Sequence, residues 1–250
     1  MTTPDALPAL KPDYGLDAPV FQRSALYGGV AGVVVGRMLI ENGVMSQTNW
    51  AIRLGGALFW AGLFFFLTGC VMFWGSRVGK LHLRNAMLNS IPWRGDEHVL
   101  DVGCGHGLML LGAAKCLESG HAVGVDIWSQ RDQKGNSAEA AMENARREGV
   151  AERVELQDAD ARKLPFQDAS FDVILSSGAI HNISGAAERE IAIREIARVL
   201  KPGGQLAIAD IRHTRQYEQI LLSLGWQQTR RWSPSFIFVT PARVLRAAKP

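Results

Sequence analysis

Three glycines at every second position, with an aspartate shortly before them, stand out in VLDVGCGHGLML, residues 99–110. A chain needs glycine where it turns sharply from a strand into a helix and where a ligand comes close to the backbone. The helix that follows such a turn also offers free backbone N–H groups in its first turn. The stretch therefore predicts a ligand-binding loop that contains Gly103, Gly105 and Gly107 and is preceded by the carboxylate of Asp101.

The spacing of this loop differs from two common phosphate-binding patterns. The pattern G-x-G-x-x-G requires glycine at the position of Leu108, and G-x-x-x-x-G-K-[ST] requires a Lys-Ser or Lys-Thr pair that does not follow. A further acid, Asp126, ends the next apolar run, 19 residues after Gly107. A carboxylate at the end of the second strand of such a fold accepts the hydroxyls of a ribose. The ligand is therefore expected to contain a ribose.

Short apolar runs alternate with helical patterns from about residue 76 onward. Strands are expected at residues 98–103, 121–128, 153–160, 171–177 and 205–211, and helices at 137–149 and 186–200. The turn KPGG, Lys201–Gly204, is expected to stop the second helix, and the tail from Trp226 reads as two further strands joined at Ser233–Ser235. This alternation predicts a parallel sheet with helices on both faces.

Four segments in order resemble the motifs of class I S-adenosylmethionine-dependent methyltransferases: VLDVGCGHG, VGVDIW, DADARKLPFQDASFDVILSS and VLKPGGQLAIAD. They are most similar to the small-molecule branch that includes enzymes of ubiquinone and menaquinone biosynthesis, and the resemblance covers about residues 78–250. It implies an α/β, Rossmann-like fold with a seven-stranded sheet in the order 3-2-1-4-5-7-6, and S-adenosylmethionine as the cofactor. This donor has an ammonium group and no pyrophosphate, which suits the acid before the loop and the missing third glycine.

The resemblance also implies which residues hold the donor. They are Asp101, Gly103, Cys104, Gly105 and Gly107 for the methionine part, Asp126 for the ribose, Ile127, Asp160 and the backbone of Ala161 for the adenine, and Ser177 beside the methyl group. In the long polar loop after the second strand, Trp128 could form a wall of the adenine pocket, and Gln133 and Asn136 could reach ligand or substrate. The alternative is a solvated loop with one anchoring tryptophan.

Methyl transfer from a sulfonium is an in-line displacement that depends mainly on proximity and alignment. A general base is needed only if the acceptor must lose a proton. His181, just past the fourth strand, is the first candidate, with a structural cap of the next helix as the alternative. Asn182 could orient the acceptor, and His213, after the fifth strand, is a second candidate base. His106, inside the glycine loop, is expected to face solvent or the carboxylate of the donor.

The N-terminal third contains two apolar segments. Residues Leu54–Trp74 form an uncharged run of 21 residues, which as a helix would be roughly 30 Å long and span a bilayer. The weaker segment Ala25–Ile40 is interpreted as the first arm of a helical hairpin, with a re-entrant or interfacial segment as the alternative. Its glycines Gly28, Gly29, Gly32 and Gly36 would let a second helix approach closely, and Gly28, Gly32 and Gly36 recur at helical spacing.

The residues around these segments predict their orientation. A cleaved signal peptide is disfavoured because the chain before residue 24 carries three aspartates and the first apolar run is followed by a longer one. The flank after Trp74 contains Arg77, Lys80 and Arg84, which the positive-inside rule assigns to the cytoplasm. A hairpin would then leave both ends of the chain in the cytoplasm.

Composition limits the other partners. The net charge is +3 without a long basic run, which argues against strong nucleic-acid binding. Cys70, Cys104 and Cys116 form no CxxC pair, so neither a zinc site nor a disulfide framework is expected. Pairing of chains through the glycine-faced membrane helices would give a homo-oligomer.

Together these patterns predict a cytoplasmic N-terminal segment (1–23), a membrane anchor (24–75) and a methyltransferase domain (76–250). The expected activity is methyl transfer to a small, lipophilic acceptor, because a tether raises the effective concentration of a membrane-dissolved substrate. The alternatives are a methyltransferase that acts on a membrane protein and a non-catalytic protein that binds S-adenosylmethionine.

Overall fold

The computed structural model describes residues 11–15, 19–130, 135–232 and 242–250. These residues form two compact units: 19–80 make up one, and 11–15, 81–232 and 242–250 make up the other. The apolar segment is therefore inserted between two pieces of the second unit, whereas the sequence suggested a separate N-terminal segment of residues 1–23. Gln133 and the expected turn at Ser233–Ser235 lie outside the described residues.

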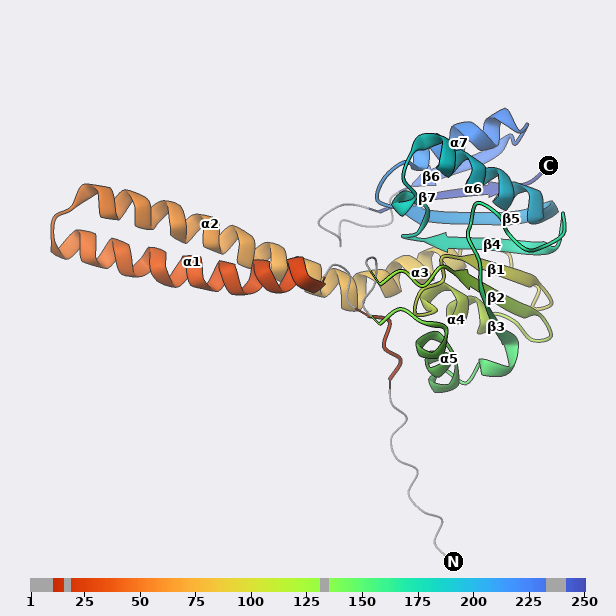
Figure 1. Ribbon diagram of the computed structural model, residues 1–250, viewed down its shortest axis with the longest axis horizontal. Coiled ribbons are helices and arrows are strands. Elements are labelled where there is room, and N and C mark those ends of the chain that lie inside the picture. Colours follow the sequence, from red (N-terminus) through yellow and green to blue (C-terminus); the bar gives the residue numbers. More distant parts are fainter. Residues whose placement is uncertain (1–10, 16–18, 131–134, 233–241) are drawn as a thin grey trace, which may run out of the picture. The chain divides into compact units, whose positions relative to one another are not determined.

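The larger unit contains a seven-stranded sheet in the order β3-β2-β1-β4-β5-β7-β6, which confirms the predicted order (Figure 1). β7 is antiparallel to both of its neighbours, and the remaining pairs are parallel. The strands are β1 (His98–Val102), β2 (His121–Asp126), β3 (Val154–Asp158), β4 (Phe171–Ser177), β5 (Leu200–Asp210), β6 (Gln228–Trp232) and β7 (Arg243–Ala248).

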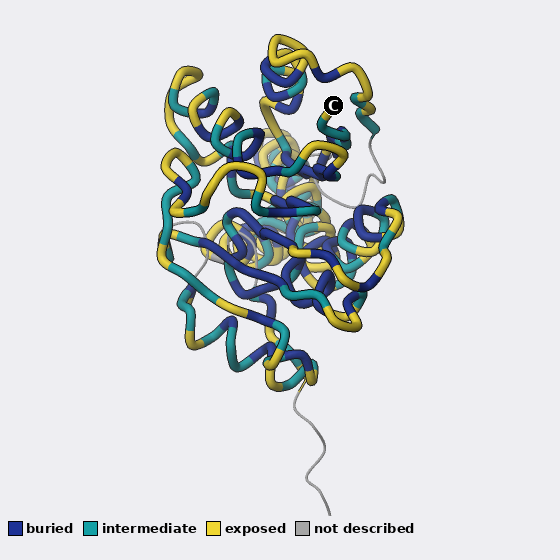
Figure 2. Tube along the Cα trace, turned by 90° about the vertical axis from the view of Figure 1, so that its right-hand side faces the viewer, coloured by how far each residue is buried: buried dark blue, intermediate teal, exposed yellow. Residues whose placement is uncertain are grey.

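The central strands are buried along almost their whole length, as Figure 2 shows. Because successive side chains of a strand point to opposite faces, burial of consecutive residues means that both faces are covered. α4 (Leu108–Ala114) and α5 (Ala138–Arg147) contact β3, and α6 (Ala186–Val199) and α7 (Thr214–Ser223) contact β5. α3 (Lys80–Leu88) precedes β1, and its Leu88 and Arg84 side chains lie against Gly112 of α4.

The KPGG turn behaves differently from a simple helix stop. α6 ends at Val199, and Leu200 already pairs with Phe171 of β4, whereas the next paired residues are Gln205 and Val173. Residues 201–204 therefore form an irregularity inside β5, and the φ of Gly203 is +76°. Glycine adopts this conformation without strain. Residues 201–204 therefore form a bulge within β5 rather than a loop between α6 and a strand.

The smaller unit is a helical hairpin of α1 (Pro19–Met45) and α2 (Asn49–Trp74). Both helices begin earlier than predicted, and α1 also ends later, because polar flanking residues continue a helix whose backbone groups are bonded internally. Gly29, Gly32 and Gly36 form the packing face: a Cβ at any of them would come within 3.0 Å of the α2 backbone. Gly28 has nothing within 4 Å, so it is not part of this face as the sequence suggested.

By length and composition two helical stretches could cross a membrane, Val20–Met45 and Asn49–Leu88, the second of which includes a π-helical turn at Gly75–Gly79. Only 17% and 11% of their apolar windows are buried within the protein. A helix from the core of a water-soluble domain would be mostly buried. Gly29, Gly32 and Gly36 pack α1 on α2 within one chain.

Candidate functional site

The glycine loop follows β1 at the carboxyl ends of the parallel strands, the edge where open α/β sheets bind ligands. Gly103, Gly105 and Gly107 have φ angles of 74°, 52° and 86°, which glycine adopts without strain. A Cβ at Gly103 would lie 2.2 Å from the Cβ of Ala179. The loop after β1, predicted to hold the donor, thus lies directly against the loop after β4, predicted to face the acceptor.

Asp101 gives the clearest sign of a cationic ligand. Its side chain is 1% exposed, and Oδ2 accepts a 2.8 Å hydrogen bond from the N–H of Leu110. The other oxygen, Oδ1, is buried and has no hydrogen-bond partner among the described residues. Burial raises the pKa of this carboxyl group to about 7, and the Leu110 hydrogen bond opposes the rise. An ammonium group beside Oδ1 would supply both a hydrogen bond and a counter-charge.

Asp126 ties the end of β2 to the glycine loop. Its Oδ2 accepts from the N–H of Gly105 at 2.8 Å, and its Oδ1 accepts from the N–H of Trp128 at 2.7 Å and from Asn136 Nδ2 at 3.3 Å. A carboxylate oxygen has two acceptor directions, so Oδ2 can also accept from a ligand hydroxyl. The indole N–H of Trp128 donates to Asp158 on β3, which fixes the ring beside this site.

The residues predicted for the adenine lie around the ends of β2 and β3. Ile127 is 66% exposed, an apolar surface directly after the ribose-binding position. Asp160 is held by the guanidinium and N–H of Arg162, which lower its pKa, so it would share its oxygens between Arg162 and a ligand. Ala161 packs partly against the core, and Ser177 is the half-buried last residue of β4.

Cys104 and His106, which stand between the glycines of the loop, have buried side chains. The Cys104 side chain is buried, its N–H donates a hydrogen bond to the carbonyl of Val125, and its own carbonyl accepts one from the N–H of Gly107. We therefore do not propose Cys104 as a residue that contacts S-adenosylmethionine. His106 was expected to face solvent or ligand, but it is only 8% exposed. Its Nδ1 lies 3.2 Å from the carbonyl oxygen of Asp13, which comes from the N-terminal part of the chain.

Residues 11–15 form an N-terminal strap that packs on this side of the larger unit. The backbone N–H of Asp13 donates to Asn144 Oδ1 at 2.9 Å, and Asn144 Nδ2 donates to the carbonyls of Asp13 and His106 at 2.8 and 3.0 Å. The Tyr14 hydroxyl donates to Glu148 at 2.7 Å, and burial is the main cause that raises the pKa of Tyr14. The strap therefore supports the glycine loop from a position more than 90 residues earlier in the chain.

On the acceptor side, His181 is part of a buried network. Its Nδ1 lies 2.6 Å from Asp210 Oδ1, and its backbone N–H and the Tyr217 hydroxyl donate to Oδ2 at 3.2 and 3.0 Å. Asp210 is 1% exposed, and burial raises its pKa while the hydrogen bonds from His181 and Tyr217 oppose the rise. Because a carboxylate only accepts, Nδ1 carries the proton and Nε2 is left with the lone pair of a base.

The two remaining predicted residues flank this network. Asn182 is exposed, and its Nδ2 donates to the carbonyl of Gly178 at 3.3 Å. His213 is exposed at the start of α7 and has a φ of 66°, a left-handed conformation that residues other than glycine rarely adopt. Desolvation lowers the pKa of His213, and the positive charges of Arg189 and Arg212 lower it further.

Sequence reasoning missed Asp210, Tyr217 and the strap. Asp210 ends β5, a position from which a side chain reaches the carboxyl edge of the sheet, and this could have identified it. Its link to His181 depends on β4 and β5 being neighbours, which the spacing of 29 residues does not reveal.

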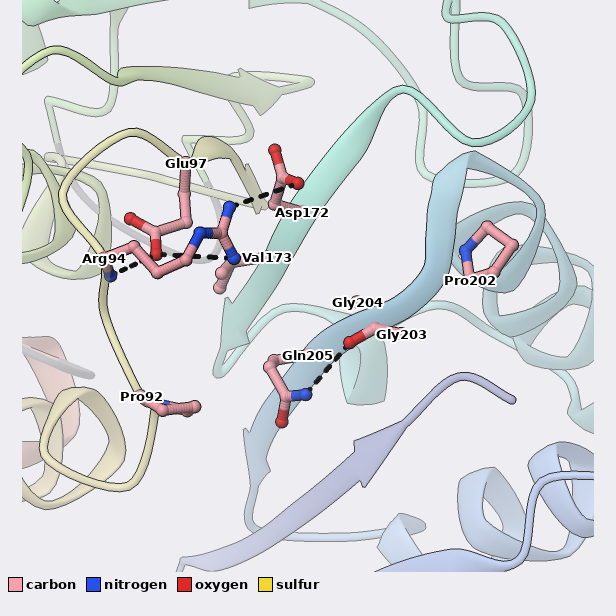
Figure 3. Close-up of a pocket in the computed structure, with 9 residues that line it drawn as sticks. All are labelled: Pro92, Arg94, Glu97, Asp172, Val173, Pro202, Gly203, Gly204 and Gln205. Atoms are coloured by element: carbon pink, nitrogen blue, oxygen red, sulfur yellow. Dashed lines mark hydrogen bonds and ion pairs between the residues drawn. The ribbon is translucent and has the colours of Figure 1, made fainter.

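A cavity at the other edge of the sheet is shown in Figure 3. It lies at the amino ends of β1, β4 and β5, opposite the glycine loop, and is lined by Pro92, Arg94, Glu97, Asp172, Val173, Pro202, Gly203, Gly204 and Gln205. Glu97 accepts hydrogen bonds from the backbone of residues 94 and 95, and Asp172 accepts from His98 and Lys201. These carboxylates stabilise the turns before the strands and are not part of the donor site.

Residues 100–208 match the family described as a methyltransferase domain. The chain is 33% identical over 128 residues to 27-O-demethylrifamycin SV methyltransferase of Amycolatopsis mediterranei (51% of this chain, 43% of the relative). It is 32% identical over 147 residues to demethylmenaquinone methyltransferase of Lactiplantibacillus plantarum (58% and 57%). The chain thus spans about half the length of these curated relatives.

Solved structures show the same fold. The crystal structure of an S-adenosylmethionine-dependent methyltransferase from Aquifex aeolicus has a TM-score of 0.55 and 22% identity, and the match covers 69% of this chain and 94% of that one. Residues 100–208 therefore resemble a methyltransferase domain in sequence, and the larger unit has the fold of these solved structures. The residues would fit S-adenosylmethionine: its ammonium group would give the buried Oδ1 of Asp101 a hydrogen-bond partner, and Ile127 offers an exposed apolar surface directly after Asp126.

Proposed function

We propose that this protein is a membrane-anchored methyltransferase that methylates a small, lipophilic acceptor, with His181 as the general base. The observation that carries the catalytic part is the His181–Asp210 pair: His181 lies on the loop after β4, and Ala179 of the same loop lies against Gly103 of the glycine loop. The donor loop and the base are thus adjacent at one edge of the sheet, which is the arrangement that in-line transfer needs.

S-adenosylmethionine supplies a methyl group that is already activated on its sulfonium. His181 Nε2 would take the proton of the acceptor as the acceptor displaces the sulfur from the methyl carbon, and the sulfur would leave with the electron pair of the broken C–S bond as S-adenosylhomocysteine. The imidazolium that results is stabilised by the buried carboxylate of Asp210, which also fixes the tautomer through Nδ1. Tyr217 holds the second oxygen of Asp210, so the carboxylate cannot rotate away from the ring.

The anchor is supported by the surface of α1 and α2. Large apolar side chains are exposed along both helices, including Val34, Met38, Trp60, Phe64 and Val71. Soluble monomers rarely expose large contiguous apolar surfaces. A lipid environment would bury these side chains without any further protein partner, and it would also concentrate a lipophilic acceptor near the active site.

The N-terminal strap limits the topology of this anchor. Residues 11–15 precede the hairpin and residues 81–232 follow it, yet both belong to the methyltransferase unit. The insert must then start and end on one side of the membrane, so it crosses an even number of times. This supports two full crossings over one crossing combined with a re-entrant arm, and the basic residues Arg77, Lys80 and Arg84 favour the cytoplasm for the catalytic unit.

Catalysis is tested by measuring S-adenosylhomocysteine release from the full chain with a membrane lipid extract. His181→Ala should reduce the rate at least a hundredfold and Asp210→Asn at least tenfold, because general-base catalysis contributes about 10² to 10⁴. His121→Ala, at the amino edge of the sheet, is the matched control and should leave the rate unchanged. Full activity in His181→Ala would rule out the base, provided that calorimetry shows unchanged S-adenosylhomocysteine binding.

Topology is tested with single introduced cysteines and a membrane-impermeant maleimide in sealed vesicles of both orientations. Ser46→Cys, in the turn between α1 and α2, and Glu118→Cys, in the methyltransferase unit, should be labelled from opposite sides. The wild-type chain gives the background from its own thiols. Labelling of both positions from one side would contradict two crossings.

A further inference from the structure

Arg189 is a buried cation near the proposed base. It lies on α6 and is 9% exposed. Its Nε donates to Gln216 Oε1 at 3.0 Å, and its Nη1 donates to the carbonyl of Ile183 at 2.9 Å. Both partners are neutral oxygens, so these hydrogen bonds leave the positive charge of the guanidinium uncompensated.

The other arginines of α6 differ from Arg189 because each of them is paired with an acidic side chain. Arg194 pairs with Glu190 at 2.7 Å, and Arg198 pairs with Glu195 at 2.7 Å, although both are more exposed than Arg189. Within the described part of the chain, Arg189 forms no ion pair. A buried charge is costly unless it is paired, so the most buried arginine of the helix is the one that lacks a counter-charge.

Arg189 lies beside the loop that carries His181. Ile183 directly follows the turn that carries His181 and Asn182, and Gln216 lies in the first turn of α7, just after His213. The guanidinium thus bridges the loop after β4 and the helix that follows β5. Its charge also influences the pKa values of His213 and Tyr217, in keeping with this location beside the base network.

Arg212 adds a second positive charge near the ends of β4 and β5. Arg212 is exposed immediately before His213, and it too forms no ion pair among the described residues. Asp210, the nearest acid in the sequence, is already bound by His181 and Tyr217. The loops after β4 and β5 therefore carry a positive charge that no acidic side chain among the described residues pairs with.

We propose that Arg189, assisted by Arg212, binds an anionic group of the acceptor, a carboxylate or a phosphate, close to the atom that is methylated. The planar guanidinium fork matches the geometry of both groups and binds them through paired hydrogen bonds. The acceptor would then have an anionic head at Arg189 and an apolar body toward the membrane. The assignment of this anion to the acceptor rests on the proposed function.

The test measures anion binding apart from turnover. The full chain in phosphatidylcholine nanodiscs, saturated with S-adenosylhomocysteine, is titrated with inorganic phosphate and with 4-hydroxybenzoate in a calorimeter. The wild type should bind at least one of them, Arg189→Gln should weaken binding at least tenfold, and Arg189→Lys should fall in between. Arg194→Gln, on the same helix, is the matched control and should bind as the wild type does.

Several results would overturn the inference. They are no anion binding by the wild type, equal binding by Arg189→Gln, or loss of S-adenosylhomocysteine affinity in parallel with anion affinity, which would reveal a purely structural brace. Failure of the wild type to bind S-adenosylhomocysteine would instead contradict the proposed function. If Arg189→Gln does not fold, phosphate should still slow phenylglyoxal modification of Arg189 in the wild type by a larger factor than it slows that of Arg194. An unchanged rate at Arg189 with and without phosphate would overturn the inference.

The source of the anion is distinguished by adding phosphatidic acid to the nanodiscs. If the site takes a lipid headgroup, phosphatidic acid should weaken the apparent affinity for free phosphate at least tenfold in the wild type but not in Arg189→Gln. If the site takes a free small molecule, the affinity should stay the same. Both results support a cationic acceptor site.

Discussion

Replacing Asp101 by asparagine is expected to stabilise the fold at alkaline pH while it abolishes donor binding. Burial raises the pKa of Asp101 to about 7 in the ligand-free protein, roughly three units above its ordinary value. At about 1.4 kcal/mol per unit, keeping this carboxylate ionised costs the native state about 4 kcal/mol above pH 7. The native state binds more protons than the unfolded state between about pH 4 and pH 7, so stability falls as the pH rises through this window.

The asparagine removes the buried charge but places an amide N–H₂ where Oδ1 has no partner, which costs about 1–3 kcal/mol. The net gain at pH 8 is therefore about 2 kcal/mol, or about 4–8 °C in the unfolding midpoint for a unit of this size. At pH 5 the wild-type carboxyl is already protonated, and the gain should be close to zero. Thermal unfolding of both proteins at pH 5 and pH 8 measures this difference.

Donor binding gives the second half of the prediction. The asparagine cannot compensate the ammonium group, so calorimetry with S-adenosylhomocysteine should show at least a tenfold loss of affinity. In the wild type, affinity should fall as the pH drops below 7, up to tenfold per unit, because the empty site takes up a proton that the ligand must displace. Asp96→Asn, an exposed carboxylate, is the control. Unchanged affinity in Asp101→Asn, or no gain in stability at pH 8, would refute the reasoning.

Three further substitutions test other parts of the structure. Gly103→Ala should destabilise the unit and abolish S-adenosylhomocysteine binding, because its Cβ would overlap the side chain of Ala179. Gly135→Ala, with a similar φ and nothing within 4 Å, is the control and should show only the effect of backbone strain. Calorimetry measures the loss of binding, and melting curves measure the loss of stability. Tyr14→Phe should lower stability by about 1 kcal/mol through loss of one hydrogen bond, and an unchanged melting curve would mean that the strap does not dock in solution. Gly62→Leu should disrupt hairpin packing, seen as faster proteolysis, while Gly56→Leu, at an open position, should not.

The sheet order was predictable because its motifs are local. Each strand end that carries a donor-binding candidate, such as Asp101 or Asp126, is marked by residues within the same short segment. Pairing of strands then follows from the resemblance to a known fold, and the structure confirms that order.

Contacts between distant segments were not predictable in this way. The Tyr217–Asp210–His181 network joins three segments that become neighbours only when β4 and β5 pair. The strap was missed for the same reason, since Asp13 and Asn144 are 131 residues apart and neither lies in a recognisable motif. His106 was expected to face solvent or the carboxylate of the donor because the sequence does not show that its Nδ1 lies beside the carbonyl of Asp13 in the strap. Packing that depends on tertiary structure leaves no periodic signal.

The central claim is that the chain transfers a methyl group from S-adenosylmethionine to a lipophilic acceptor. The most direct measurement uses the full chain in nanodiscs, S-adenosylmethionine with a trideuterated methyl group, and a membrane extract separated into lipid, protein and aqueous fractions for mass spectrometry. The account predicts a deuteromethylated product in the lipid fraction that is absent with His181→Ala. A label confined to the protein fraction, or no label in any fraction from a chain that binds S-adenosylhomocysteine, would contradict it.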